Sequence, residues 1–392
     1  MKILLVHNHY QMPGGESIVF DNLHRLLKQV GQESIIYSRH NSEISHFNLK
    51  QKALMGIEGF FSMRTWREIR RLIQKEKPQV AIVQNVFPLI SPSVYYALKS
   101  SNVPVIQAVY NYRFVCPNGH LFCNGAICER CVGGNYWNAV IRKCYRNSYI
   151  ISGWYAAILT FCRLTGTFAR KIDVFMVPDN FLGTRLIAGG IPAAKITKNV
   201  NPFFVEDYQF HYGQGKFILY VGRLVRQKGV FTLINAMTRV SSDGLPLYIV
   251  GEGEERKALE LLIIRLGLQD RVRILGPKWG GRVKQLIQES AFLVVPSEWY
   301  DNLPLIICQA YASGKPVIAS AINGIPEYVE DGVDGLLFQP GDAQDLARCI
   351  ECLSTDSTLL AEMSVNARRK AEQKLDYRVY WNKLNDIIKK LL

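Results

Sequence analysis

The chain has 392 residues, of which 48% are hydrophobic and 20% are charged. This length predicts two domains, and the composition excludes a disordered protein. The formal net charge is +14, and residues 1–200 carry all of the excess, with 24 Lys and Arg against 10 Asp and Glu. The positive electrostatic field of such a charge excess attracts anionic partners, which include nucleic acid, anionic membrane surfaces and phosphorylated substrates.

The chain opens on a short apolar run from Lys2 to Val6. This run is too short for a signal peptide and predicts a buried strand, so we expect a cytoplasmic protein. The most apolar later stretch, Tyr149 to Leu164, is interrupted by Gly153 and falls short of the roughly 20 residues that cross a bilayer. We therefore expect at most a peripheral position on the cytoplasmic face of a membrane.

Short apolar runs alternate with amphipathic segments along the whole chain. We predict strands at residues 2–7, 34–39, 80–84, 104–109, 174–178, 217–222, 247–251, 272–275, 291–296 and 316–320, with helices in most of the intervals. This alternation is typical of parallel sheets with helices on both faces. It predicts an α/β protein of two Rossmann-like, doubly wound domains.

A stretch rich in proline and glycine, from Asn201 to Gly215, precedes the sixth strand and marks the boundary between the domains. We place the first domain at residues 1–205 and the second at residues 206–392. The last amphipathic segment, at about residues 358–391, has no strand after it and can pack on either domain.

Ligands of parallel α/β sheets bind beyond the carboxyl ends of the strands, and four loops there in the second half carry suitable residues. The first loop holds Arg223 and Lys228, two cations that fit a diphosphate, although an exposed basic turn is the alternative for this loop alone. The second places Glu252 between two glycines. The third and fourth, at residues 296–304 and 320–327, open helices whose free amides can face an anion, or are ordinary turns.

These loops resemble the family four retaining glycosyltransferases, which have the GT-B fold. The resemblance rests on Gly222-Arg223-Leu224 with Lys228-Gly229, on Gly251-Glu252-Gly253, and on the run from Pro304 to Glu327. It implies two domains facing a central cleft, a nucleoside diphosphate sugar as donor, and retention at the transferred sugar. No divalent metal is required, because side chains supply the cations.

The resemblance implies catalytic roles for Arg223, Lys228 and Asp301. It assigns donor binding to Gly14, Gly15, Gly222, Glu252, Asn302, Leu303, Pro304, Gln309 and Glu327. The family commonly has two glutamates where this chain has Asp301 and Gln309. Gln309 can hydrogen-bond a ribose hydroxyl but carries no charge, which affects nucleoside preference.

In the first half, Gly14 and Gly15 stand at the mouth of a predicted helix, where backbone amides can approach an anion or simply form a flexible turn. In the family, this turn faces the donor phosphates. Tyr110 and Asn111 are on the acceptor side, in a segment where relatives often have histidine in place of Tyr110. Tyrosine can donate a hydrogen bond but is no base near neutral pH without a large pKa shift.

Five of the nine cysteines lie within residues 116–144. Reduced cytoplasmic thiols favour metal binding or plain packing over disulfides. Cys128 and Cys131 have zinc spacing, and Cys116 with Cys144 can complete four thiolate ligands. A structural zinc at these four residues and ordinary packing are the two interpretations.

Basic and aromatic residues occur together at residues 60–71, and cations bracket the apolar stretch at residues 149–164. Both segments favour an anionic membrane surface as a partner, with a solvated basic face as the alternative. Nucleic acid is not expected, because no recognised motif accompanies the charge.

We therefore expect transfer to a saccharide or lipid-linked saccharide acceptor in cell-surface polysaccharide biosynthesis. The alternative is a homologue that binds a sugar nucleotide or a partner protein without turnover, and Tyr110, Asp301 and Gln309 are the evidence for it. A sugar-nucleotide epimerase of the same fold is a third candidate.

Overall fold

The computed structural model describes residues 1–11, 14–211 and 215–392. The chain forms two compact units, one of residues 1–202 with 377–392 and one of residues 203–376. The predicted boundary after residue 205 lies three residues beyond this division, and the last helix, counted with the second domain in the prediction, groups with the first unit. Residues 212–214 of the predicted linker and residues 12–13 before the predicted glycine turn lie outside the described residues.

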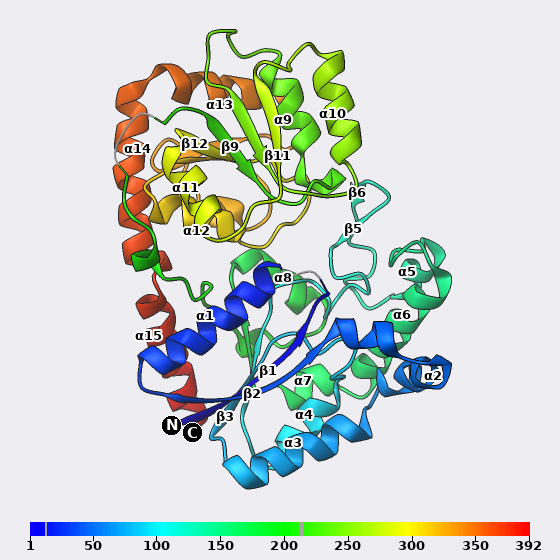
Figure 1. Cartoon of the computed structure of the whole chain (residues 1–392). Helices are drawn as coiled ribbons and strands as arrows, with labels where there is room; N and C mark the ends of the chain where they lie inside the picture. Colours follow the sequence, from blue (N-terminus) through cyan, green and yellow to red (C-terminus); the bar gives the residue numbers. More distant parts are fainter. Residues whose placement is uncertain (12–13, 212–214) are drawn as a thin grey trace. The chain divides into compact units, whose positions relative to one another are not determined.

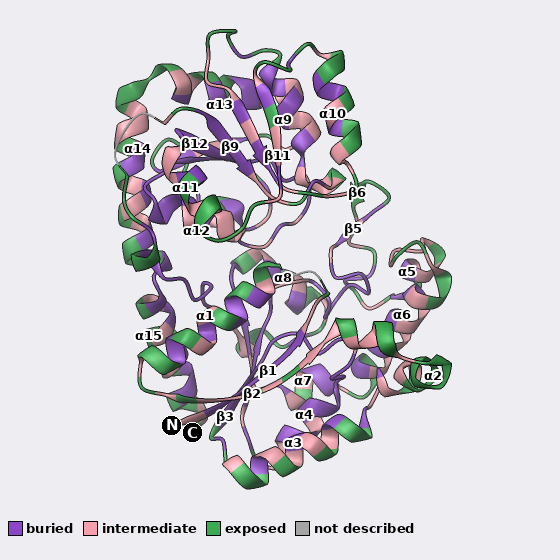
Figure 2. Ribbon diagram, viewed as in Figure 1, coloured by how far each residue is buried: buried purple, intermediate pink, exposed green. Residues whose placement is uncertain are grey.

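The first unit contains a parallel sheet in the order β2-β1-β3-β4-β7-β8. Its strands are β1 (Lys2–His9), β2 (Glu33–His40), β3 (Val80–Val83), β4 (Val105–Ala108), β7 (Val174–Val177) and β8 (Ile196–Lys198). Residues 3–6 of β1 are fully buried, because helices cover both faces of the sheet (Figure 1; Figure 2). This burial explains the continuous apolar run at the start of the chain.

The helices of the first unit are α1 (Gly15–Gln29), α2 (Leu49–Glu58), α3 (Met63–Glu76), α4 (Ser93–Ser100), α5 (Trp137–Ile141), α6 (Tyr149–Leu164), α7 (Thr167–Lys171), α8 (Asn180–Ala188) and α15 (Tyr377–Leu391). Two strands of two residues each, β5 (Phe122–Cys123) and β6 (Ala126–Ile127), pair antiparallel. The contacts of helix α15 with the rest of this unit include two side-chain hydrogen bonds. The side chain of Gln29 donates to the Tyr377 hydroxyl at 2.9 Å, and that of Asn199 donates to the Tyr380 carbonyl at 3.1 Å.

The second unit repeats the architecture with the order β11-β10-β9-β12-β13-β14, again all parallel. Its strands are β9 (Ile218–Val221), β10 (Leu247–Val250), β11 (Val272–Gly276), β12 (Phe292–Val295), β13 (Val317–Ser320) and β14 (Gly335–Phe338). Its helices are α9 (Val230–Met237), α10 (Arg256–Arg265), α11 (Gly281–Glu289), α12 (Leu305–Ala312), α13 (Ala343–Thr355) and α14 (Ser357–Lys370).

All ten predicted strands occur within a few residues of their predicted limits. The structure adds one edge strand to each sheet, β8 in the first unit and β14 in the second, and it adds the small β5–β6 hairpin. Among the described residues, no helix is both long and apolar enough to cross a membrane.

Candidate active site

The strand order of each sheet identifies where a ligand would bind. In the second unit the chain runs outward from β9 through β10 to β11 and then returns to place β12 on the other side of β9. In the first unit β1 has the same position, between β2 and β3. At such a switch point the loops after the two central strands diverge and leave a crevice. The candidate ligand-binding loops are therefore those after β9 and β12 in the second unit and those after β1 and β3 in the first.

The loop after β9 lies tightly against the loop after β10. The backbone amide of Gly222 donates to the Val250 carbonyl at 3.0 Å, and that of Leu224 donates to the Glu252 carbonyl at 2.9 Å. A Cβ atom on Gly251 would lie 1.8 Å from the Gly222 carbonyl oxygen, so only glycine fits there. The Tyr220 hydroxyl fixes the turn further by donating to the Arg223 carbonyl at 3.0 Å.

The same loop also lies against the loop after β12. Gly229 has a φ of +69°, and a Cβ atom there would lie 1.7 Å from the Pro296 carbonyl oxygen. The Glu298 amide donates to the Gln227 carbonyl at 2.9 Å. These contacts require a glycine at position 229 and bring Lys228 next to the loop after β12.

Lys228 forms an ion pair with Asp301, and a third loop supports it. The Asp301 carboxylate also accepts from the Ser297 hydroxyl at 3.0 Å, while the Asp301 carbonyl accepts from the Asn323 side chain, after β13, at 2.6 Å. The side chains of Lys228 and Asp301 are only 18% and 12% exposed. Lys228 lies 5.6 Å from the centroid of the Trp299 ring. A cation and its carboxylate are thus held at the switch point with little freedom.

Arg223 differs from Lys228 because its side chain is exposed, and it forms no salt bridge with any described carboxylate. Its position follows from the backbone turn that Tyr220 holds. An exposed guanidinium and a nearly buried ammonium on one loop can contact a diphosphate from two directions. The structure therefore brings together the three residues to which the sequence assigned catalysis.

The other predicted donor residues differ in what surrounds them. The Glu252 carboxylate pairs with Arg256 at 2.6 Å, and Gln309 hydrogen-bonds the Tyr208 hydroxyl. Leu303 is buried, and Pro304 caps α12 with extended backbone. Asn302 and Glu327 are half-buried in the loops after β12 and β13.

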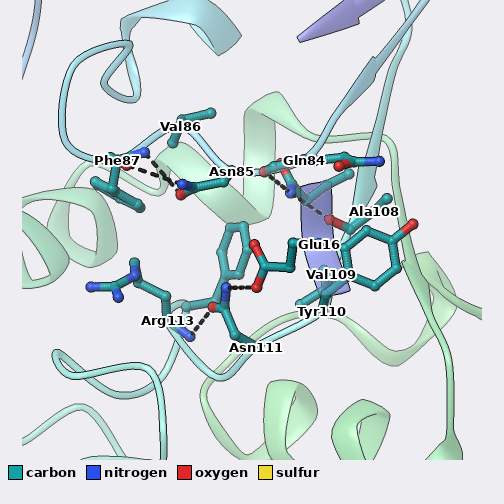
Figure 3. Close-up of a pocket in the computed structure, with 12 residues that line it drawn as sticks. Glu16, Gln84, Asn85, Val86, Phe87, Ala108, Val109, Tyr110, Asn111 and Arg113 are labelled. Carbon is teal, nitrogen blue, oxygen red and sulfur yellow. Dashed lines mark hydrogen bonds between the residues drawn. The ribbon is translucent and has the colours of Figure 1, made fainter. Parts of the chain in front are cut away.

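In the first unit, the start of α1, the loop after β3 and the end of β4 with its following loop line a small cavity of about 20 Å³ (Figure 3). This is room for about one water molecule. Its lining includes Glu16, Asn85, Tyr110, Asn111 and Arg113. The predicted acceptor-side residues thus line a cavity of the unit to which the sequence assigned the acceptor.

Glu16, at the start of α1, connects the glycine turn to this cavity. Its carboxylate accepts from the Asn111 side chain at 2.7 Å, and the side-chain oxygen of Asn111 accepts from the Arg113 backbone amide at 2.9 Å (Figure 3). Burial raises the pKa of Glu16 above its usual value. Gly14, in contrast, is exposed and has open space where a Cβ atom would lie.

Burial also raises the pKa of Tyr110 well above 10, so its hydroxyl stays protonated. The guanidinium of Arg113 is buried, donates to the Pro117 carbonyl at 3.1 Å and lies 4.8 Å from the Tyr155 ring centroid. Arg113 and Glu16 were not among the predicted site residues. Their positions in the sequence, close to Gly14 and Tyr110, could have identified them as site residues.

The cysteine cluster does not support the predicted zinc site. Among the described residues, no three or more His, Cys, Asp and Glu side chains form a group able to hold a metal. The Sγ atoms of Cys123 and Cys144 lie 3.2 Å apart, whereas the Cys116 thiol donates to Asn118 at 3.0 Å. Burial raises the pKa of Cys131 to about 12, which keeps a thiol protonated near neutral pH.

Comparison with solved structures defines the class of fold. Anabaena HepE in complex with UDP matches with a TM-score of 0.71 and 18% identity, over 100% of both chains. Sucrose-phosphate synthase from Thermosynechococcus elongatus matches with a TM-score of 0.73 and 17% identity, over 100% of this chain and 98% of that chain. The protein therefore has the GT-B fold, as predicted from the sequence.

A family model matches much of the second unit. Residues 206–370 match the sequence model of the family Glycosyl transferases group 1. This region contains the loops after β9, β12 and β13 described above.

Curated relatives include several enzymes with related names. The amylovoran biosynthesis glycosyltransferase AmsK of Erwinia amylovora is 30% identical over 220 residues, which cover 53% of this chain and 54% of AmsK. The lipopolysaccharide core biosynthesis glycosyltransferase LpsE of Rhizobium meliloti is 33% identical over 147 residues, covering 38% of this chain and 42% of LpsE. The chain thus spans about half the length of the curated relatives it matches, or less.

Proposed function

We propose that the protein is a glycosyltransferase that moves a sugar from a nucleoside diphosphate sugar to a saccharide or lipid-linked saccharide. The observation that carries this proposal is the pairing of Lys228 with Asp301, beside exposed Arg223, at the switch point of the unit that the group 1 family model matches. A bound UDP in a structure of the same fold, and relatives named for amylovoran and lipopolysaccharide core biosynthesis, support a nucleotide donor and a role in cell-surface polysaccharide synthesis.

In the proposed reaction, the bond between the sugar and the diphosphate breaks as an acceptor hydroxyl oxygen bonds to the same carbon. The hydroxyl proton passes to the departing phosphate, which gives retention by attack from the same face. Arg223 and Lys228 stabilise the negative charge that grows on the diphosphate, and preorganised cations of this kind commonly provide the largest share of catalysis. Asp301 holds Lys228 in place and lies where the donor sugar is expected.

The diphosphate site is tested by calorimetry with UDP and with UDP-glucose. We expect Arg223→Ala and Lys228→Ala each to weaken binding by about 1.5–3 kcal/mol, because each removes a charge-assisted contact. Arg226→Ala is the matched control, since Arg226 lies on the same loop but stacks over Phe231 at 4.8 Å. Unchanged affinity in both test variants would disprove the assignment.

A protein that binds a sugar nucleotide without turnover is the second candidate. It is favoured by Gln309, whose side chain hydrogen-bonds Tyr208, and by the protonated Tyr110. The two candidates differ in whether UDP is released from UDP-sugars when acceptor saccharides are added. Tight UDP-sugar binding with no UDP release across a panel of acceptors would favour the second candidate.

The proposal includes association with an anionic membrane surface, where lipid-linked acceptors would be held. The support is the charge of the first half, which carries the whole excess of +14. Each cation near an anionic leaflet contributes about 1 kcal/mol, so a few of them give salt-sensitive binding.

A further inference from the structure

Three helices of the first unit expose large apolar side chains at their surface. Helix α2 buries none of its residues, and Figure 2 shows it without a buried stretch. Ile150, at the start of α6, is 85% exposed, and Leu49, at the start of α2, is 84% exposed. Apart from Leu164, at the far end of α6, these side chains are Leu49, Leu54 and Ile57 on α2, Trp137 and Ile141 on α5, and Tyr149 and Ile150 on α6. We call these seven residues the apolar edge.

The three helices are neighbours, with α6 in contact with both others. The Trp154 indole of α6 donates to the Gly56 carbonyl of α2 at 2.6 Å. Helix α5 packs against α6, and in the segment that connects them the Tyr145 amide donates to the Ser152 hydroxyl of α6 at 3.0 Å. Figure 1 shows α2, α5 and α6 together at one side of the first unit. The apolar edge is therefore one region rather than scattered exposed residues, which need no explanation.

Cations outnumber acidic residues around the apolar edge. Residues 47–58 and 135–158 contain the cations Lys50, Lys52, Arg142, Lys143 and Arg146, and their one acidic residue is Glu58, at the end of α2. Lys143 lies 4.4 Å from the Tyr149 ring centroid, so cation and aromatic ring are adjacent. A second copy of the chain docked face to face would bring these cations against one another, which disfavours a symmetric dimer here.

We propose that the apolar edge is the part of the molecule that enters the interface of an anionic membrane. Leucine and isoleucine side chains would lie at the boundary between head groups and acyl chains, with Trp137 and Tyr149 at head-group level. The five cations would contact lipid phosphates. This inference rests on the membrane part of the proposed function and assigns a specific surface to it.

Helix α3 overlaps the first of the two segments that the sequence favoured as a membrane contact, residues 60–71, and it exposes less apolar surface than the apolar edge does. Arg64 pairs with Glu68 at 2.8 Å, and Arg70 stacks on Trp66 at 4.7 Å. On α3, Met63 is the one exposed large apolar residue. A cationic helix with little exposed apolar surface attracts anionic lipids from a distance but gains little free energy by inserting into the interface.

The test is co-sedimentation with phosphatidylcholine vesicles that contain or lack phosphatidylglycerol. We expect the combined variant Leu54→Asp/Ile57→Asp/Ile150→Asp to reduce binding to the anionic vesicles by about tenfold or more. Leu261→Asp/Ile264→Asp, two equally exposed residues on α10 of the second unit, is the matched control and should bind as the wild type does. Reversal of Arg64, Arg67 and Arg71 to Glu should have a smaller effect.

Circular dichroism and UDP calorimetry show whether each variant remains folded. Because all three substituted side chains are exposed, we expect both measurements to match the wild type. Anionic vesicle binding that survives in the triple variant would overturn the inference and leave the rest of the proposed function standing. Absence of vesicle binding by the wild type would overturn the membrane part as well, whereas UDP binding tests the donor site separately. A wild-type dimer that the triple variant abolishes would identify a second copy as the occupant instead.

Discussion

Lys228 and Asp301 form an ion pair that joins the loop after β9 to the loop after β12, and Ser297 and Asn323 hold the aspartate from two sides. Any anion that binds Lys228 must share this cation with Asp301. The pair therefore keeps the Lys228 ammonium in place before the donor binds. Because Asp301 repels the donor diphosphate, the pair also sets an electrostatic cost for donor binding.

Replacing Asp301 by Asn should reveal this competition. Without its counter-charge, Lys228 lies in a nearly buried position, so we expect the free energy of unfolding to fall by about 1–3 kcal/mol. UDP would then supply the missing negative charge, and the rise in melting temperature on adding UDP should exceed that of the wild type. UDP is chosen because it lacks the sugar that Asp301 is proposed to contact.

The control is Glu372→Gln, whose carboxylate is 53% exposed and pairs with Arg368 at 2.6 Å, and it should change little. Equal melting shifts in Asp301→Asn and the wild type would mean that Lys228 does not meet the diphosphate.

Gly229→Ala tests whether the close contact between the two loops shapes the site. A Cβ atom would lie 1.7 Å from the Pro296 carbonyl oxygen at a left-handed φ, so we expect destabilisation by about 1–3 kcal/mol and weaker UDP binding. Gly281→Ala, at the start of α11 with open space around its Cα, is the control. Urea unfolding and calorimetry give the two quantities. An unchanged UDP affinity in a destabilised Gly229→Ala would show that the contact serves stability alone.

Most strands could be predicted from the sequence because they lie buried within a parallel sheet and read as apolar runs. The two missed strands lie at sheet edges and give a weaker signal: β8 consists of Ile196–Lys198, all half-buried, and β14 begins with Gly335. The opposite edge strands, β2 and β11, were predicted. The place of α15 could not be predicted, since its amphipathic pattern indicates a buried face without naming the surface that covers it. Its contacts with Gln29 and Asn199 join residues that are 348 and 181 positions apart in the sequence.

At the site, the residue types and loops were predictable but their partners were not. Arg223 and Lys228 were found from local motifs. The pairing of Lys228 with Asp301, 73 residues away, depends on how the strands are ordered in the sheet. The same holds for the cysteines. The spacing of Cys128 and Cys131 suggested zinc with Cys144 as a further ligand, whereas in the structure the Sγ atom of Cys144 lies 3.2 Å from that of Cys123.

Glu16→Gln should alter how stability depends on pH. Burial raises the pKa of Glu16 in the folded state, so its contribution to stability is present at low pH and is lost as pH rises through that pKa. The neutral glutamine still accepts the Asn111 hydrogen bond, and the variant should gain stability relative to the wild type as pH increases. Thermal unfolding across a pH series measures this. The control is Glu362→Gln, an exposed substitution on α14, and a stability difference for Glu16→Gln that stays constant with pH would contradict the prediction.

His7 should destabilise the first unit in acid. Its ring is fully buried in β1 and stacks on Phe20 at 4.9 Å, and neither ring nitrogen has a hydrogen-bond partner among the described residues. Burial lowers the pKa of His7 to about 3, with the neighbouring His9 as a smaller cause. The unfolded chain takes up a proton near pH 6.5 and the folded chain does not, so stability falls as pH drops from about 6.5 towards 3, by up to about 1.4 kcal/mol per unit.

His7→Phe removes this proton uptake while keeping an aromatic ring against Phe20. We therefore expect the variant to lose less stability than the wild type between pH 7 and pH 4, as measured by urea unfolding at each pH. The comparison uses the slope with pH rather than the absolute stability, because the substitution also changes packing. His24→Phe is unsuitable as a control, since His24 hydrogen-bonds Ser34 at 2.7 Å, whereas exposed His46→Phe leaves the core unchanged. Parallel pH profiles for His7→Phe and the wild type would mean that His7 is protonated in the folded protein.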